Sequence, residues 1–396
     1  MPVRRKRSVQ YQRRCAGWIV FLPLLWMLSG CSTVPRSDAF RTLRPLPTAP
    51  SDRADRAVLS AFFTASGIAL TPAEVDEIIP ARSPSGRLDR NALRRIARRH
   101  NRLVWVLQAD ETHLWEELKR NHPLLLYLPA PSPGRQTAAL SIPLSWDRTT
   151  GRLTLLDGSG ATYDLPASDF FARREEWKHA ALRLVPPREF GRMRPTLEQK
   201  QLMADFWYHQ GAYRRAAALY KQTEEESDSS AATVEALCGR GNSLVQQKRY
   251  TAAIALFRQA LALEPDNADV LNNLAYALLC GNGGLMEALR YSTRAVEQAP
   301  GNPLFLETLG TLHLRLGDGE TAARLLEQAW ARALRHPDSV QRAIMEQLIR
   351  AWFAAGRTDL AWQVADHRRR THPSHPLPKD IVASFPSLRN PPAPLE

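Results

Sequence analysis

The sequence predicts an α+β domain over residues 51–188, followed by an all-α helical repeat array over residues 195–372. In the first segment, runs with helical spacing precede short apolar runs bounded by turn residues, the order typical of an α+β domain. From Pro195 the helical pattern is continuous, and Pro265 and Pro300 end comparable helices 35 residues apart. With 396 residues and 44% hydrophobic content, the chain is long enough for two or three domains.

Residues 1–30 have the pattern of a bacterial secretory signal. Six Lys and Arg residues and no acid precede an apolar run over 16–28, which is too short to span a bilayer. Leu28-Ser29-Gly30-Cys31 then matches a lipobox, so Cys31 resembles the lipid-modified first residue of bacterial lipoproteins. A plain signal peptide and an uncleaved anchor helix are the alternatives. The resemblance implies that lipid on Cys31 attaches the protein to a membrane.

Residues 31–50 are rich in Ser, Thr, Pro and Arg without a helical or strand period, which predicts a tether. Ser32 follows Cys31, whereas enteric lipoproteins held at the inner membrane carry Asp at that position. The resemblance therefore favours the outer membrane, with the protein facing the periplasm. Removing the six signal charges from the formal net charge of +13 leaves about +7. These charges are scattered rather than clustered with aromatic residues, so we expect no nucleic-acid partner.

The helices expected in the first domain have recognisable starts. Ala57–Ala65 is apolar at helical spacing, and Thr71-Pro72-Ala73-Glu74 combines an N-cap, a first-turn proline and a capping-box acid. Asp89–His100 is strongly basic and amphipathic, and Thr112–Asn121 is the last helix expected in this domain.

The strands expected in this domain form an antiparallel sheet. Asp147–Gly151 provides turn chemistry between two of them. The expected strands are 103–106, 124–128, 138–146, 153–156, 162–165 and 180–185.

This domain resembles the bacteriocin-processing, papain-like cysteine peptidases, and more closely lipoproteins that join such a domain to helical repeats. The family motif Gln-Cys-Gly-Pro-Ala-Ala-Leu aligns with residues 53–59, which read Arg-Ala-Asp-Arg-Ala-Val-Leu. By this resemblance Ala54 replaces the nucleophile and Arg53 the oxyanion-hole Gln. The family histidine falls near Ala139, in a segment (137–147) without His, and Asp157 is the possible remnant acid. The resemblance thus implies a papain-like fold whose catalytic residues are lost.

A replacement nucleophile is the alternative to an inactive domain. Residues 51–187 contain no cysteine, so thiolate chemistry is excluded there in any register. The histidines at 100, 113, 122 and 179 show no recognisable Ser/His/Asp order, and no Gly-x-Ser-x-Gly occurs. We therefore expect no catalytic residues, no metal and no cofactor.

The repeat array shows small and aromatic residues at recurring positions. The clearest copy carries Gly241, Tyr250, Ala253, Phe257 and Pro265, where small residues permit close helix contact and aromatic residues fill the holes. These positions resemble the tetratricopeptide (TPR) repeat, which implies an all-α TPR superhelix with a concave groove. We count about five units over 195–372, three of them clear, and a loose proline-rich tail over 373–396.

The resemblance also implies binding residues on the first helix of each repeat. Asn242 and Asn273 lie where repeat asparagines often bond the backbone of a bound peptide; a purely consensus role is the alternative. Cys238 replaces the lysine of a carboxylate clamp, so we expect no clamp. Cys238 and Cys280 are interpreted as buried structural cysteines, although a disulfide between them is sterically possible.

Three functions follow from these observations. We favour a lipid-anchored, catalytically inactive, peptidase-like protein that acts as a protein- or peptide-binding scaffold in the bacterial envelope, with its ligand in the TPR groove. The alternative is a periplasmic peptidase with an unrecognised nucleophile. A third possibility is a purely structural envelope component.

Overall fold

The computed structural model describes residues 33–34, 51–80, 88–128, 139–157, 161–175, 179–334 and 336–389. The chain divides into two compact units. Unit 1 comprises Met1–Asp89 and Val106–Arg183, and unit 2 comprises Arg90–Trp105 and Leu184–Glu396. The segment 90–105, which we expected in the first domain, therefore belongs to unit 2. The lipobox and Cys31 lie outside the described residues.

Five α-helices precede residue 180 in the described part of the chain, and two of them, α2 and α4, have side-chain N-caps. They are α1 (Ser51–Ala65), α2 (Pro72–Ile78), α3 (Arg90–Arg99), α4 (Glu111–Lys119) and α5 (Ala167–Arg174). Thr71 and Glu74 form the predicted capping box of α2, and Asp110 caps α4. Helix α5 was not predicted, because its eight residues begin at Pro166 without a side-chain cap.

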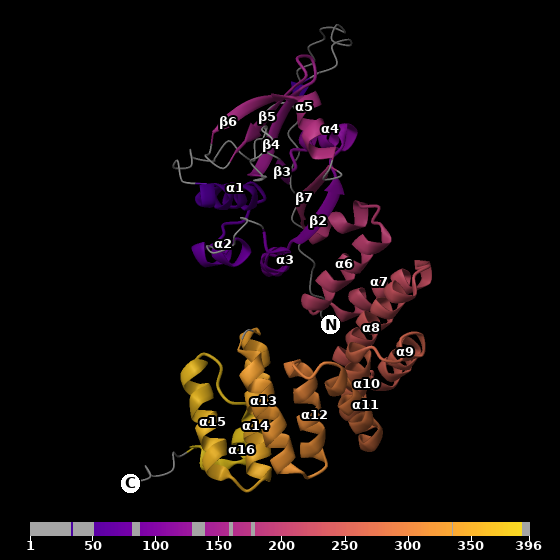
Figure 1. Ribbon diagram of the computed structural model, residues 1–396, viewed down its shortest axis with the longest axis vertical. Helices are drawn as coiled ribbons and strands as arrows, with labels where there is room; N and C mark the ends of the chain where they lie inside the picture. The colour runs from indigo at the N-terminus through magenta and orange to yellow at the C-terminus, as the bar shows by residue number, and fades with distance from the viewer. Residues whose placement is uncertain are drawn as a thin grey trace, which may run out of the picture. The chain divides into compact units, whose positions relative to one another are not determined.

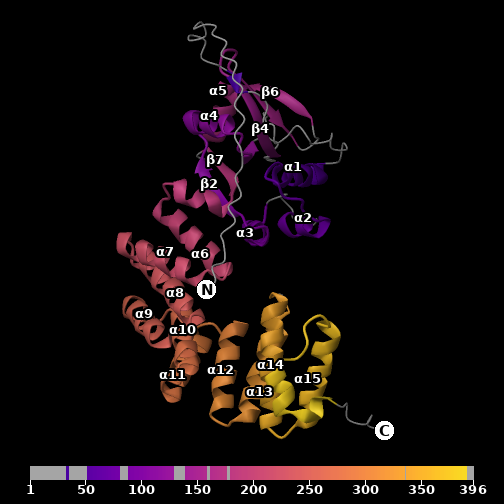
Figure 2. The same ribbon diagram turned by 180° about the vertical axis from the view of Figure 1, so that it is seen from behind.

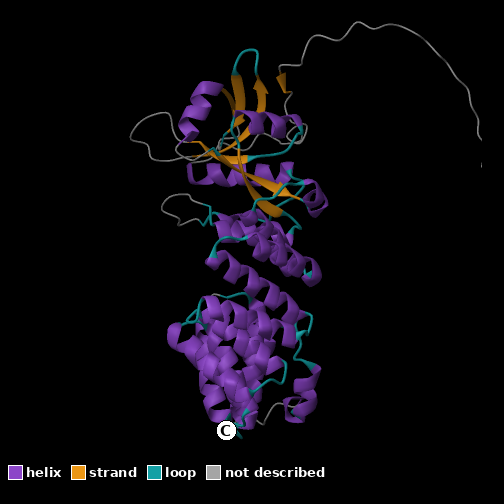
Figure 3. Cartoon of the chain, turned by 90° about the vertical axis from the view of Figure 1, so that its right-hand side faces the viewer, coloured by secondary structure: helices purple, strands orange, loops and turns teal. Residues whose placement is uncertain are grey.

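The strands form a sheet (Figures 1 and 3), and β3 to β7 pair antiparallel within it, as the turn signals predict. Its order is β2-β7-β3-β4-β5-β6. At the β4–β5 turn, Asp147 accepts hydrogen bonds from the amides of Thr149 and Thr150, and Gly151 has the positive φ that the turn requires. The strands are β2 (Leu103–Gln108), β3 (Leu125–Leu128), β4 (Ala139–Asp147), β5 (Arg152–Leu156), β6 (Thr162–Pro166) and β7 (Ala180–Val185).

One part of the expected tether is not irregular. Thr33–Val34 forms the two-residue strand β1, which pairs antiparallel with Trp146 and Asp147 of β4. Both residues are β-branched and therefore favour a strand, and they lie along the edge of β4. This pairing explains why these two residues are not irregular, as we expected of a tether.

The core of unit 1 is built around Trp146, which is 2% exposed. Its ring meets Trp115 of α4 edge-on at 5.8 Å and Phe171 of α5 at 5.7 Å. The Arg148 guanidinium lies 5.3 Å from the ring centres of both tryptophans. Helices α4 and α5 therefore pack on the sheet through aromatic contacts at β4, and Figure 2 shows both helices beside the sheet.

From Thr196 onward, unit 2 is a stack of helix pairs (Figure 1). Glycines lie where paired helices touch: a Cβ on Gly241 would lie 2.5 Å from the Phe257 ring, and one on Gly239 would lie 2.4 Å from the Tyr220 ring. The small residues are therefore required by packing, as predicted. The pairs are α6 (Leu197–His209) with α7 (Tyr213–Glu226), α8 (Ser230–Gln246) with α9 (Tyr250–Leu263), α10 (Ala268–Cys280) with α11 (Leu285–Gln298), α12 (Pro303–Arg315) with α13 (Gly319–Ala333), and α14 (Asp338–Ala354) with α15 (Thr358–Thr371).

The expectation of a loose tail after residue 373 is wrong for the residues up to 389. Helix α16 (Lys379–Ser384) and a 3₁₀ turn (Pro386–Arg389) pack on the last helix pair. Ile381 and Leu388 are buried, and the Phe385 ring stacks on Phe353 at 3.9 Å. The free energy gained by burying these apolar side chains outweighs the tendency of a proline-rich segment to remain irregular. The buried segment covers the end of the helix stack.

Candidate functional site

The first candidate site is the junction of α1 and β4 in unit 1, where the peptidase resemblance places its catalytic residues. The backbone amide of Leu140 donates a hydrogen bond of 2.8 Å to the Asp55 carboxylate. Burial raises the pKa of Asp55, and this hydrogen bond opposes the rise. A half-buried carboxylate thus ties the start of the helix to the start of the strand.

The predicted positions 54 and 139 are each next to one partner of that hydrogen bond. The backbone therefore brings the start of α1 and the start of β4 together. The side chains of Ala54 and Ala139 lie outside those that the structure describes. Asp55 occupies the position of the motif glycine, a substitution whose structural consequence the sequence did not reveal.

Asp157, the possible remnant acid, lies at the end of β5. Its backbone amide donates to the carbonyl of Ala161 at 3.1 Å, and its carboxylate accepts from the Ala161 amide at 3.2 Å. These contacts close the connection to β6. They give Asp157 a turn-forming role, the role of an acid before glycine.

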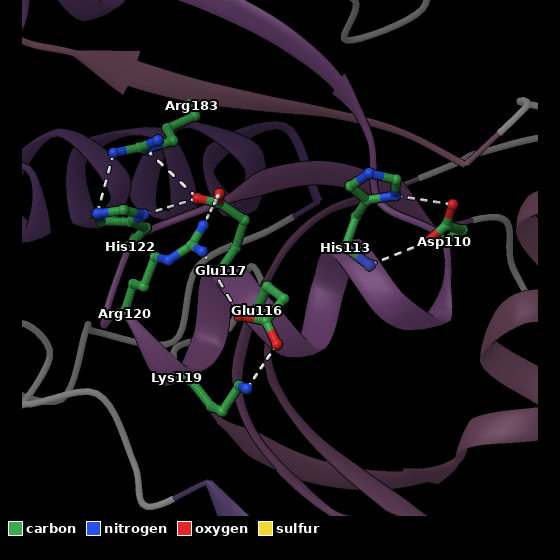
Figure 4. Close-up of polar contacts among 8 residues, drawn as sticks. All are labelled: Asp110, His113, Glu116, Glu117, Lys119, Arg120, His122 and Arg183. Carbon is green, nitrogen blue, oxygen red and sulfur yellow. Dashed lines mark hydrogen bonds and ion pairs between the residues drawn. The ribbon is translucent and has the colours of Figure 1, made fainter. Parts of the chain in front are cut away.

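His122 belongs to a hydrogen-bonded ion cluster centred on Glu117 (Figure 4). The Arg183 guanidinium lies 3.0 Å from His122 Nε2, and His122 Nδ1 lies 2.7 Å from the Glu117 carboxylate. Because a guanidinium only donates, Nε2 accepts and the neutral ring donates from Nδ1 to Glu117. Burial alone would raise the pKa of Glu117, but His122 and Arg183 outweigh it and lower the pKa. Both ring nitrogens are engaged, so this cluster fastens α4 to β7.

A pocket of about 480 Å³ in unit 1 gathers Asp110, Ser168 and His179, which bear on the alternative of a replacement nucleophile. His179 has a positive φ of 53°, and its Nδ1 is buried without a hydrogen-bond partner. Among the described residues no hydrogen bond joins Ser168 to His179. The Asp110 carboxylate is held by the amide and ring of His113 at 2.9 and 2.8 Å. The three residues share a pocket without forming a catalytic relay.

The second candidate site is the series of first helices in unit 2, where α8 contacts α10 and α10 contacts α12. The predicted Asn242 on α8 and Asn273 on α10 are both half-buried. Aligning the two helices on Gly241 and Ala275 puts Tyr276, rather than Asn273, at the position equivalent to Asn242. The spacing of the small residues is the signal that identifies Tyr276.

Several side chains on these helices are suited to contact a ligand. Tyr276 and Leu304 are 40% and 41% exposed, although both are large. The Oδ1 atom of Asn272 is buried without a hydrogen-bond partner. Burial raises the pKa of Glu307 on α12 to about 7. This surface therefore combines apolar area with polar groups that the described residues do not fully satisfy.

The two cysteines of the repeats are free thiols. Burial, together with Asp269, Glu264 and Glu235, raises the pKa of Cys238 to about 12, and burial also raises that of Cys280. Both thiols are thus protonated and poorly nucleophilic at neutral pH, as expected for structural cysteines. Within the described ranges, no cluster of His, Cys, Asp and Glu has the makings of a metal site. No helix of the part that the structure describes is long and apolar enough to cross a bilayer.

Comparisons with known proteins agree with the repeat architecture. The family model described as "TPR repeat" matches residues 241–279. The TPR repeat-containing thioredoxin TTL4 of Arabidopsis thaliana is 35% identical over 106 residues, which are 27% of this chain and 15% of that protein. The chain thus matches about one seventh of that relative's length. These comparisons support TPR repeats in this chain, with the family match over residues 241–279.

Three solved structures illustrate the likeness of this chain to proteins of known structure. TTC0263, a thermophilic TPR protein of Thermus thermophilus, is 19% identical, covers 49% of this chain and 99% of its own, and has a TM-score of 0.40. BtubC of P. vanneervenii is 19% identical, with coverages of 46% and 84% and a TM-score of 0.39. YrrB, described as a TPR protein with an unusual peptide-binding site, is 21% identical, with coverages of 49% and 93% and a TM-score of 0.36.

Proposed function

We propose that this protein is a lipid-anchored, catalytically inactive, peptidase-like protein that serves as a protein- or peptide-binding scaffold in the bacterial envelope. The observation that carries the binding role is the contiguous series α8, α10 and α12, with Tyr276 and Leu304 exposed on it. TPR arrays use the first helices of their repeats as extended binding surfaces. Large side chains left exposed there suit an extended peptide better than a small metabolite.

The inactive character rests on chemistry that unit 1 lacks. Residues 51–187 contain no thiol, and no His lies in the segment 137–147 where the resemblance puts the base. Restoring only the two lost side chains, by Ala54→Cys with Ala139→His, is expected to leave turnover well below that of an intact peptidase. Arg53 and Asp55 still replace the motif Gln and Gly in that variant.

Site-specific photo-crosslinking tests the binding surface. A photoreactive residue at position 276, on a first helix, is expected to crosslink a protein or peptide in envelope extracts. The matched control is position 286, where Met286 is 63% exposed on the second helix α11. Equal crosslinking at the two positions, or crosslinking only at 286, would reject the first-helix surface.

The anchoring is tested by metabolic labelling with an alkyne fatty acid. We expect label and membrane retention in the parent chain and loss of both in Cys31→Ala. An unlabelled chain would leave the scaffold role intact but reject the lipid anchor.

The alternative peptidase activity has a specific candidate in the pocket of Ser168 and His179. We expect no hydrolysis of a mixed peptide library and no labelling by a serine-directed fluorophosphonate. Hydrolysis that disappears in Ser168→Ala would establish the alternative and reject the inactive scaffold.

A further inference from the structure

Unit 2 contains a pocket of about 250 Å³ that the scaffold role does not use. Helix α3 contributes Arg94, Arg95 and Arg98 to its lining, and α6 contributes Asp205 and Phe206. Leu103, Val104 and Leu202 complete an apolar wall. Strong positive charge thus meets apolar surface in one concave site.

The three arginines converge because of their spacing. Positions 94, 95 and 98 lie on one side of α3, while Leu93 and Ile96 are buried on the other. Like charges three and four residues apart repel each other on a helix. The helix is also held at its end, since the Gln210 side chain donates to the Arg98 carbonyl at 2.8 Å. The three arginines, which repel one another, are therefore held close together at a fixed position.

Two arginine side chains of this pocket, those of Arg94 and Arg98, have no partner within the described part of the chain. The guanidinium groups of Arg94 and Arg98 form no hydrogen bond or ion pair with a described residue. Asp205 accepts a hydrogen bond of 2.6 Å from the Tyr220 hydroxyl. Burial lowers the pKa of Arg98; Asp205 opposes this effect, and Arg95 and Arg94 add to it. The guanidinium groups of Arg94 and Arg98 against the one carboxylate of Asp205 leave a net positive charge in the pocket lining.

We propose that this pocket binds a small organic anion, a carboxylate or a phosphate that carries an apolar group. Arginine forks bind either group through paired, charge-assisted hydrogen bonds. Phe206 and Leu202 would contact the apolar group. The volume lies just below the usual range for drug-sized ligands, which favours a compact anion.

Calorimetric titration of the full chain with phenyl phosphate, benzoate, inorganic phosphate and benzyl alcohol tests the proposal. We expect the two aromatic anions to bind more tightly than inorganic phosphate, and benzyl alcohol not to bind. Arg94→Gln and Arg98→Gln should each weaken binding about tenfold or more. Arg99→Gln is the matched control, an exposed arginine of α3 outside the pocket lining, and should change affinity less than about twofold.

Two further variants make the test decisive. Asp205→Asn keeps an acceptor for Tyr220 but removes the opposing charge, so it should tighten binding. If Arg98→Gln fails to fold, Arg98→Lys retains the charge without the fork and should bind with intermediate affinity. Preference for phenyl phosphate assigns the site to phosphates, and preference for benzoate assigns it to carboxylates. Equal weakening by Arg99→Gln, binding of benzyl alcohol as tight as that of the anions, or no binding of any anion at about 1 mM would overturn the proposal.

Discussion

The two units are held together by contacts of very different range along the chain. In unit 1, the hydrogen bond between Leu140 and Asp55 joins residues 85 positions apart. In the repeats of unit 2, Gly241 packs against Phe257 of the next helix, and each helix pair contacts mainly its neighbours. Contacts within the repeats join residues that are close in sequence, so the repeats can be predicted from the sequence. Contacts in the mixed sheet join distant residues, so the side chains that meet there are harder to predict.

The largest expected effect concerns Arg174 in unit 1, which is fully buried. Its guanidinium donates to the Ala180 carbonyl at 2.6 Å and lies 5.1 Å from the Phe170 ring centre. Arg174→Ala leaves a cavity and an unsatisfied carbonyl, so we expect a loss of about 3 kcal/mol in unfolding free energy. Urea unfolding measures the loss, and hydrogen exchange should localise it to unit 1.

Two control variants separate volume from charge at this position. Arg174→Met fills most of the space and removes a buried charge, so it should cost less than Arg174→Ala. The half-buried neighbour Arg173 should tolerate alanine within about 0.5 kcal/mol. If Arg173→Ala lowers the unfolding free energy as much as Arg174→Ala does, then Arg174 does not specifically connect α5 to β7.

The next effect tests the short-range packing of unit 2. Gly241→Ala places a methyl group 2.5 Å from the Phe257 ring, so the paired helices must separate. We expect a loss of about 2 kcal/mol, measured by urea unfolding. Gly301 has no atom within 4 Å of the added position, and Gly301→Ala should be nearly neutral. A neutral Gly241→Ala would contradict the account of small residues at helix contacts.

Much of this architecture follows from sequence reasoning, for identifiable reasons. The helix pairs were predictable because each needs only local spacing, as from Gly241 to Phe257. Capping chemistry located α2, because Thr71 and Glu74 act within one turn. Helices α5 and α16 were missed because short helices without side-chain caps leave little local signal.

The candidate sites were less predictable than the elements that carry them. The basic character of α3 was evident, but the meeting of Arg98 with Asp205 on α6 depends on packing between distant segments. The same holds for Asp55, whose partner Leu140 is 85 residues away. Periodicity indicates which face of an element is buried, but it does not identify the element that covers it.

A smaller effect tests the long-range hydrogen bond of unit 1. Asp55→Ala removes the acceptor of the Leu140 amide, and we expect a loss of about 1–2 kcal/mol. Asp55→Asn retains an acceptor and removes a charge that burial disfavours, so it should be neutral or slightly stabilising at pH 7. Unfolding titrations of the two variants give the comparison. A larger loss in Asp55→Asn than in Asp55→Ala would mean that the charge itself is required.

The last expected effect is a pH dependence that belongs to unit 2. Burial raises the pKa of Glu307 from 4.5 to about 7, so the folded state holds a proton that the unfolded chain has released between these values. Stability should therefore rise as the pH falls from 7 toward 4.5, by at most about 1.4 kcal/mol per pH unit. Glu307→Gln removes the titrating group and should flatten this part of the profile, measured by urea unfolding between pH 4.5 and 8. A profile unchanged by Glu307→Gln would assign the pH dependence to other groups. A flattened profile would assign this pH dependence to the buried carboxyl of Glu307.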